Sequence, residues 1–237
     1  MASTLNLRPV DGTFSLGDHI YGVLREAILN MNVYDPGTDL RLDERALSDA
    51  LKISRTPVRE ALVRLEQDGF VEVRARKGVY VLRKSHGEIM EMITVWAALE
   101  SMAARLATER ASDEEIASLR AMAGRFGSDD AKAHIEEYSE SNIAFHQRIL
   151  ELSQCMMLKT IADGLFMHMR AVRRKAMAEK DRSSRSVAEH IGIIEALEAR
   201  DADRAARETR EHTMRLHDHV RDTWVDLDEV KKKNAAG

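Results

Sequence analysis

LDERALSDALKISRTPVREALVRLEQDGFVEVRARKGVYVL, residues 42–82, is the stretch from which the fold of this chain can be worked out. Two short helical patterns open it, because apolar residues recur at helical spacing in each. The first pattern consists of Ala46, Leu47, Ala50 and Leu51, and the second of Val58, Ala61, Leu62 and Leu65. The three residues 52–54 between them leave room only for a tight turn. The stretch therefore predicts a helix-turn-helix.

The second of these helices has recognisable ends. Ser54 or Thr56 can cap its start, since both carry a side-chain oxygen that accepts from backbone N–H groups. Pro57 falls in the first turn, where a missing N–H removes no intrahelical hydrogen bond. Asp68 and Gly69 are expected to end the helix.

The polar face of the same helix has a basic N-terminal end. Arg55 and Arg59 are four residues apart, so they project together from that end. A recognition helix presents its N-terminal residues to base edges in the major groove. Arg64 lies about half a turn round the helix from Arg55, and we expect no groove contact from it.

Two short apolar runs follow, residues 70–73 and 79–82, on either side of the basic segment 74–78. This pattern predicts a β-hairpin with a basic tip, the wing of a winged helix. Residues 52–84 contain nine Lys or Arg and four Asp or Glu, a balance of +5 in a chain whose net charge is −4. The alternative from the residues alone is an ordinary charged helix beside an ordinary hairpin, because helix-turn-helix patterns also occur by chance.

The segment LSDALKISRTPVREALVRLEQDGFVEV, with KGVYV after it, resembles the winged-helix domain of the GntR family of bacterial transcription regulators. SRTPVREAL is the most specific piece, and the resemblance covers about residues 16–84. It implies a double-stranded DNA operator as partner. It also implies a set of DNA-contacting residues, which maps onto Arg45, Arg55, Thr56, Arg59 and Gly78.

Length and composition bound the rest of the chain. The 237 residues allow two domains of ordinary size, each with its own core. No apolar run approaches the ~20 residues that span a bilayer, and the N-terminus lacks the apolar core of a signal peptide. The single cysteine, Cys155, excludes an internal disulfide, which agrees with a reducing cytoplasm. We therefore expect a cytoplasmic protein without a membrane partner.

The chain is expected to be mainly α-helical, a winged helix-turn-helix followed by an all-α bundle. The expected domains are a flexible tail over 1–14, a DNA-binding domain over 15–84, a linker over 85–87, a helical effector-binding and dimerisation domain over 88–226, and a tail over 227–237. Apolar periodicity predicts bundle helices over about 88–109, 113–125, 130–152, 156–178, 184–199 and 202–225. Short connections between such helices are typical of a bundle.

Three histidines and an asparagine are candidates to meet inside this bundle. Asn142 and His146 share a helix face, and His190 lies in an apolar stripe of a later helix. If the last two helices form an antiparallel hairpin turning near residue 201, His212 faces His190. His219 lies about two turns further along, roughly 10 Å away, and is not expected to join them.

Imidazole nitrogens with one oxygen suit a borderline divalent ion such as Zn, Ni or Mn. From spacing alone, histidines packed and hydrogen-bonded in the core remain the stronger alternative, because nine histidines in a helical protein will place some inward. Glu189 is adjacent to His190 in sequence, and its helix position, about 100° further round, is expected to point it away from the cluster.

IAFHQRILELSQ, AEHIGIIEAL and REHTMRL, in this order, are similar to the FCD effector domain of FadR-type members of the same family. The resemblance covers about residues 88–226 and favours the metal over plain core packing. It maps the family's metal ligands onto Asn142, His146, His190 and His212, with an aspartate common at the first position. A neutral amide there leaves the site one unit more positive than a carboxylate would.

Four protein ligands leave room on an octahedral ion for a small anion, and many members of this family bind carboxylates there. An organic acid is therefore the expected effector. Arg170, Arg173 and Arg174 are candidates to hold it, with a solvated or interface stripe as the equal alternative. Trp96 stands where relatives often have an arginine, which points to a less acidic, larger or more aromatic effector.

Three functions compete at this point. The first is a homodimeric transcription regulator controlled by a small molecule. This is the function that we expect, and it implies that the protein is not an enzyme. The second is a metal-dependent hydrolase, which would need a general base, and no H-E-x-x-H motif is present. The third is an architectural DNA-binding dimer without an effector. The sequence identifies neither the effector nor the operator, nor does it say whether the protein represses or activates.

Overall fold

The computed structural model describes residues 16–35, 37–125, 134–179 and 182–224, and the expected tails over 1–14 and 227–237 lie outside them. The described residues divide into two compact units. The first unit ends at Leu82 and comprises residues 16–30 and Asp39–Leu82; the second comprises Met31–Thr38 and the chain from Arg83 onward. No described helix is long and apolar enough to cross a membrane.

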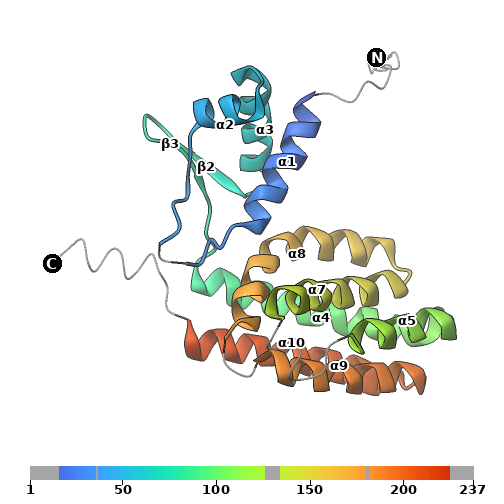
Figure 1. The fold of residues 1–237 in the computed structure, drawn as a ribbon. Coiled ribbons are helices and arrows are strands. Elements are labelled where there is room, and N and C mark those ends of the chain that lie inside the picture. Colours follow the sequence, from blue (N-terminus) through green and yellow to red (C-terminus); the bar gives the residue numbers. More distant parts are fainter. Residues whose placement is uncertain (1–15, 36, 126–133, 180–181, 225–237) are drawn as a thin grey trace, which may run out of the picture. The chain divides into compact units, whose positions relative to one another are not determined.

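The first unit is a winged helix (Figure 1). Its helices are α1 (Leu16–Asn30), α2 (Glu44–Leu51) and α3 (Arg55–Gln67), and its strands are β1 (Arg41–Leu42), β2 (Val71–Arg74) and β3 (Gly78–Val81). β3 lies between β1 and β2 and runs antiparallel to both. The predicted helix-turn-helix and wing are thus confirmed. The two-residue strand β1 was not predicted, because it exists only through its pairing with β3.

The predicted inner stripe of α3 is confirmed. Its four members, all at most 2% exposed, are Val58, Ala61, Leu62 and Leu65. α1 packs against α3 and closes the core above this stripe. Gly69 adopts a positive φ of 72°, and the Phe70 N–H donates to the Leu65 carbonyl at 2.9 Å, which ends the helix where the sequence predicted.

The first helix of the motif, α2, differs in part from its prediction. Asp43 caps it by accepting from two backbone N–H groups at 2.9 Å, and Lys52 turns the chain with a φ of 55°. Of the four residues of the apolar pattern, Leu47 and Leu51 are half-buried, whereas Ala46 and Ala50 are exposed. The side of α2 that is buried is one step further round the helix, where Ser48 is only 7% exposed.

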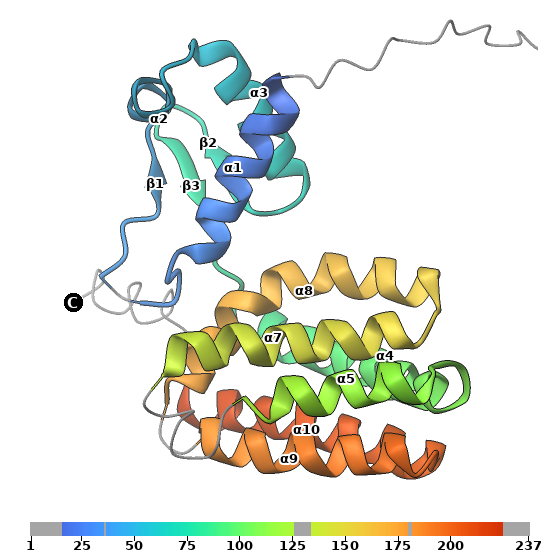
Figure 2. The same cartoon turned by 45° about the vertical axis from the view of Figure 1, so that its right-hand side comes forward.

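The second unit is an all-α bundle whose six described helices run roughly along one direction (Figures 1 and 2). They are α4 (His86–Arg110), α5 (Asp113–Ala123), α7 (Ile135–Leu152), α8 (Met156–Met177), α9 (Arg182–Glu198) and α10 (Ala202–Thr223). α4 packs against α7, α8 and α10, and α5 packs against α7 and α9. The bundle prediction is confirmed, with helix ends within about two residues of expectation outside the undescribed segment before α7.

The linker expected over residues 85–87 is corrected by the structure. Ser85 is the N-cap of α4, and a capping box joins it to Glu88. His86 and Gly87 therefore lie in the first turn of the helix. The polar composition of this segment reflects helix capping, which uses the same residue types as a loop.

The short segment Met31–Thr38, between α1 and β1, belongs to the second unit. Val33 and Tyr34 are each 6% exposed, and the Tyr34 ring packs on Trp224, with ring centres 5.2 Å apart. Arg83 donates from Nε to the Val33 carbonyl at 2.5 Å. Trp224 in turn donates from Nε1 at 3.2 Å to Glu179, which follows the C-cap of α8. The segment is thus anchored to the bundle by both packing and hydrogen bonds.

Candidate metal centre and nucleic-acid interface

The basic residues predicted to contact DNA lie on the exposed surface of the first unit. Arg55 and Thr56 are the first two residues of α3 and both are exposed. The Arg59 Nε donates to the Glu44 carboxylate at 2.7 Å, which links α3 to the start of α2. Arg45, beside Glu44, has an 83% exposed side chain. Three arginines therefore lie at the adjoining N-terminal parts of the two helices of the motif.

Arg64, further along α3, contacts α1 instead. Its guanidinium lies 4.4 Å from the centre of the Tyr21 ring and forms an ion pair with Asp18. This contact agrees with the sequence-based expectation that Arg64 points elsewhere than Arg55. Its role in the first unit is to hold α3 against α1.

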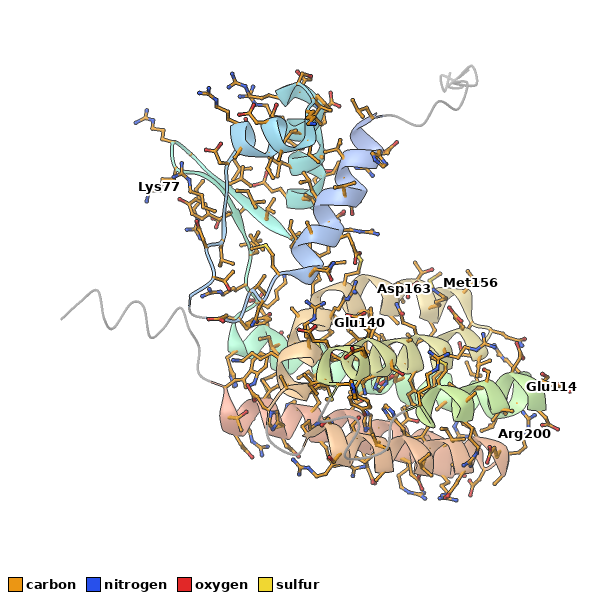
Figure 3. The ribbon with its side chains drawn as sticks, in the orientation of Figure 1. Lys77, Glu114, Glu140, Met156, Asp163 and Arg200 are labelled. Atoms are coloured by element: carbon orange, nitrogen blue, oxygen red, sulfur yellow. The ribbon has the colours of Figure 1, made fainter. Side chains whose placement is uncertain are left out.

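The wing has a basic tip. Figure 3 shows Lys77 extending from the tip of the β2–β3 hairpin. Arg76 in the same turn and Gly78 at the start of β3 have positive φ values of 63° and 108°. Gly78 is needed there for its backbone conformation, since a side chain at that φ would be strained. Arg74 at the end of β2 pairs with Glu72 at 2.8 Å, which leaves Arg76 and Lys77 to supply the charge of the tip.

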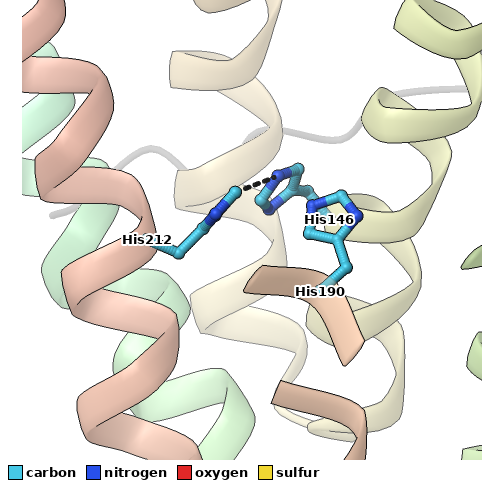
Figure 4. Close-up of side chains that lie close together, drawn as sticks. All are labelled: His146, His190 and His212. Carbon is cyan, nitrogen blue, oxygen red and sulfur yellow. Dashed lines mark hydrogen bonds between the residues drawn. The ribbon is translucent and has the colours of Figure 1, made fainter. Parts of the chain in front are cut away.

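Three histidines from three helices meet in the core of the bundle. Figure 4 shows His146 of α7, His190 of α9 and His212 of α10 converging, and the ligand-type nitrogens of the three lie within 4.8 Å of one another. All three residues are at most 3% exposed. The Nε2 atoms of His146 and His212 are 3.3 Å apart. The predicted hairpin register of α9 and α10 is confirmed by the 4.8 Å between the His190 and His212 ring centres.

Two carboxylates set the orientation of two of the rings. Glu100 of α4 accepts from His146 Nδ1, and Glu189 of α9 accepts from His212 Nδ1 at 2.6 Å. A neutral imidazole has one N–H, so a donating Nδ1 leaves a lone pair on Nε2. Both Nε2 atoms therefore carry a lone pair, and the two atoms lie 3.3 Å apart. Carboxylates behind imidazoles are the usual support of metal-ligating histidines.

Burial keeps the three imidazoles neutral. It lowers the pKa of His146 and His190 well below the usual 6.5, and the charge of Arg173 adds to the effect. The pKa of His212 is lowered as well, again by burial, although its bond to Glu189 opposes the shift. Burial would raise the pKa of Glu189, but His212 and nearby arginines outweigh it and bring the value to about 2. Neutral imidazoles are the form that binds a metal ion.

Asn142 lies beside the cluster, one turn before His146 on α7. Its Nδ2 donates to Ser186 Oγ at 3.1 Å and contacts His190 Nε2 at 3.3 Å. Its Oδ1 is buried and has no hydrogen-bond partner among the described residues. A buried acceptor without a partner is costly, so this oxygen suits a ligand that the protein itself does not supply. The prediction that these four residues come together agrees with this geometry.

Of the four effector candidates, two lie at the cluster. Arg173 is 1% exposed, and its Nη1 is 2.8 Å from His146 Nε2. Trp96 is fully buried and its ring lies 5.5 Å from the Arg173 guanidinium carbon. Arg170 and Arg174 instead form ion pairs with Glu140 of α7, at 3.0 and 3.4 Å. The stripe of three arginines is therefore divided between the core and the outer face of α8.

Sequence reasoning missed two residues of the site and misjudged one of them. Glu100 is fully buried, where it accepts from Thr213 at 2.7 Å as well as from His146. Its signal in the sequence was a single acidic residue inside the apolar stripe of α4. The expectation that Glu189 points away from the cluster was wrong, because its side chain reaches across to His212 on α10. A residue about 100° round α9 from His190 can face α10, which carries His212.

A winged helix joined in one chain to an all-helical bundle is an arrangement typical of transcription regulators that have a DNA-binding domain and a second, helical domain. The model of the bacterial regulatory proteins of the gntR family matches residues 16–81. The model of the FCD domain matches residues 91–215, more than half of the chain. The chain belongs to the GntR family of transcription regulators and carries an FCD domain.

Similar proteins are of the same kind. The chain is 24% identical over 209 residues to the HTH-type transcriptional repressor RspR of Escherichia coli K12, covering 88% of this chain and 90% of RspR. It is 38% identical over 124 residues to the Nta operon transcriptional regulator of Aminobacter aminovorans, covering 51% of this chain and 58% of that protein. The solved structure of E. coli McbR/YncC matches with a TM-score of 0.73 at 20% identity, over 90% of this chain and all of that one.

Proposed function

We propose that this GntR-family regulator binds a divalent metal ion, Zn, Ni or Mn, in its bundle, and that a small organic acid binding there controls its affinity for a DNA operator. The observation that carries the proposal is the pair of Nε2 atoms, on His146 and His212, that face each other at 3.3 Å with their Nδ1 atoms engaged by carboxylates. Two neighbouring nitrogens bound at ~2.05 Å to one octahedral ion lie about 2.9 Å apart, close to the 3.3 Å between these two atoms. A cation bound between them could accept one lone pair from each Nε2 atom and so form two metal–nitrogen bonds.

The proposed ligands are Asn142, His146, His190 and His212. Glu100 and Glu189 orient two of the imidazoles from behind, and the amide oxygen of Asn142 has no other partner among the described residues. When bound, the ion supplies a positive centre that attracts a carboxylate. The chain's own residues fix the rings, exclude water from the core, and hold Arg173 beside the cluster.

In the DNA-binding part of the proposal, Arg55, Thr56 and Arg59 read the major groove from the start of α3. Arg45 contacts the backbone from α2, and Gly78 lets the wing approach the DNA closely. The exposure of these helix termini and the basic hairpin tip support this assignment. The cytoplasm is the compartment in which such a regulator meets its operator.

We further propose a homodimer on a two-fold operator, with contact through the bundle. α4 and α8 pack together, and each exposes apolar side chains that a second copy can cover. These are Val95 and Met102 on α4 and Met156, Met157 and Ile161 on α8, all at least 49% exposed. Figure 3 shows Met156 at the outer surface of α8. Two copies would bring two recognition helices to two half-sites.

The two other functions have less support. A hydrolase needs a carboxylate or histidine free to act as general base, and the two carboxylates at the cluster are both engaged by imidazole N–H groups. An architectural protein needs no buried histidine cluster. Turnover assays distinguish the regulator from the hydrolase. Metal analysis with a metabolite thermal-shift screen distinguishes the regulator from the architectural protein.

Metal titration into chelator-treated, full-length protein tests the site. His190→Ala should lose the metal without unfolding, while Asn142→Asp should bind it more tightly, because a carboxylate adds a charge and a better donor. The same Asn142→Asp change should weaken binding of an anionic effector. His219→Ala is the matched control, since His219 lies on α10 but donates to Glu179 at 2.9 Å, outside the cluster. If His190→Ala and Asn142→Asp both bind metal like the wild type, these residues are core packing.

A further inference from the structure

Arg173 is a buried arginine with unused hydrogen-bonding capacity. Its Nη1 donates to His146 Nε2 at 2.8 Å, and its Nη2 lies 3.7 Å from the Glu100 carboxylate, beyond hydrogen-bond length. Its Nε and Nη2 have no hydrogen-bond partner among the described residues. A guanidinium carries five donors in a planar fork that fits a carboxylate. The buried guanidinium of Arg173 thus has five N–H donors, of which one makes a short hydrogen bond.

The single bond that Arg173 makes is directed at a proposed metal ligand. His146 Nδ1 donates to Glu100, so Nε2 has one lone pair, and that lone pair accepts from Arg173 in this structure. One lone pair cannot serve both a guanidinium N–H and a cation. The two cations would also repel each other at this distance. Metal ligation by His146 therefore requires that Arg173 move off Nε2.

Among the charged side chains around the cluster that are at most 15% exposed, the charges sum to zero before any ion is added. Arg215 also pairs with Glu189, at 2.7 Å, but its side chain is 46% exposed and its charge is screened by solvent. Arg173 and Arg182 contribute two positive charges, and Glu100 and Glu189 contribute two negative ones. Asn142 is neutral where an aspartate would have subtracted one unit. A divalent ion therefore brings an uncompensated charge of +2 into the core, which is costly without a counter-ion. An effector with two negative charges balances it. This differs from the less acidic effector expected from Trp96, because Arg173, 5.5 Å from the Trp96 ring, supplies a positive charge at this place.

We infer that Arg173 is a positioning residue that occupies His146 Nε2 and is displaced by the metal, so that its guanidinium then binds one carboxylate of a small dicarboxylate effector. This inference rests on the metal site of the proposed function and assigns the regulation and the effector class of that site. It makes the order of binding obligatory, with the ion first and the dianion second. It also implies that Arg173 weakens binding of the ion alone and strengthens binding of the ion together with the effector.

Zn²⁺ affinity tests the first half in full-length, chelator-treated protein. Arg173→Met should bind Zn²⁺ about 10- to 100-fold more tightly than the wild type, the range expected when a competing charged hydrogen bond is removed. Arg182→Met is the matched control, because Arg182 is equally buried and charged but donates to Glu189 and to the His212 carbonyl. It should change Zn²⁺ affinity less than about 5-fold. Damage to the fold would weaken binding, so a gain cannot arise from it.

Succinate and its monoanionic amide, succinamate, test the second half on Zn²⁺-loaded protein by calorimetry. The wild type should bind succinate at least about tenfold more tightly, and Arg173→Met should lose that preference. Zn²⁺ binding by folded Arg173→Met that is equal to or weaker than wild type overturns the displacement. Equal binding of the two acids by the wild type overturns the dicarboxylate assignment.

Failure of the metal site itself gives a different result, since no variant, the wild type included, would then bind Zn²⁺. If Arg173→Met does not fold, the double variant Glu100→Gln/Arg173→Met takes its place in the titration. That variant removes one buried charge of each sign and so leaves the core balanced. It is expected to bind Zn²⁺ more tightly than Glu100→Gln alone, and the absence of any gain overturns the inference.

Discussion

Replacing Arg55 or Arg64 by alanine should separate DNA binding from stability within one helix. Arg55 is the exposed first residue of α3 and makes no hydrogen bond or ion pair with another described residue. Its loss should therefore change the free energy of unfolding by less than about 0.5 kcal/mol. If it contacts a guanine, its loss should weaken specific DNA binding by about 1–3 kcal/mol, or roughly 5- to 150-fold in Kd.

Arg64→Ala should show the opposite result. The ion pair with Asp18 joins side chains that are 46% and 54% exposed, so solvent screening limits it to about 0.2–1 kcal/mol. Stacking on Tyr21, at 4.4 Å, adds about 0.5–1 kcal/mol. The expected loss is about 1–2 kcal/mol in the free energy of unfolding, with specific DNA affinity changed less than about twofold once the protein is folded.

The assay pairs urea unfolding with fluorescence anisotropy on a DNA site selected from a random library by the full-length protein. Salt is fixed, because phosphate contacts make affinity strongly salt-dependent. A scrambled site of equal length shows whether Arg55→Ala affects recognition of sequence, in which case the affinity gap between the two sites narrows. Equal losses of specific affinity from Arg55→Ala and Arg64→Ala, with stability unchanged in both, would refute the orientation of α3 proposed above.

Three further outcomes are expected. Gly78→Ala should lower the free energy of unfolding by about 1–2 kcal/mol, because the φ of 108° at this position strains any side chain. Gly22→Ala in α1, where no atom lies within 4 Å of the added Cβ, should raise it by up to about 1 kcal/mol, and urea unfolding measures both. Chelator-treated protein should lose stability as pH falls below about 6.5, because unfolding frees buried imidazoles to take up protons. Urea unfolding at several pH values should show this slope, and His190→Gln should reduce it by about a third if the three imidazoles contribute equally. A fragment of residues 1–84 should bind the selected DNA more weakly in the anisotropy assay than the whole chain, and tight binding would contradict a dimerising role for the bundle.

The parts of the fold that follow from local periodicity could be predicted. The stripe of α3 from Val58 to Leu65 repeats at helical spacing, and the glycine after it marks the end of the helix, so both were found. β1 and the anchoring of Tyr34 could not be found in this way. Each depends on a partner distant in sequence, Tyr80 for Arg41 and Trp224 for Tyr34, and no local pattern encodes such pairing.

The part of the candidate site that depends on helix geometry alone could be predicted. His190 and His212 were paired from their equal distance to a turn, and His146 and Asn142 from their four-residue spacing. The carboxylates of Glu100 and Glu189 were not predicted to support the histidines, because a charged residue in a helix usually faces solvent. Arg173 could not be told from its neighbours Arg170 and Arg174, since one step of rotation on α8 decides between the core and the surface.

The anchored segment Met31–Thr38 has a consequence for anyone who wishes to exchange the two halves of this regulator. The backbone passes between the units three times, after Asn30, after Thr38 and after Leu82, and not through a single connection. A chimera cut only at residue 84 would carry Val33 and Tyr34 away from the bundle that buries them. In a working hybrid, the segment Met31–Thr38 and the bundle must come from the same protein. The segment would then interrupt a DNA-binding unit that comes from the other protein.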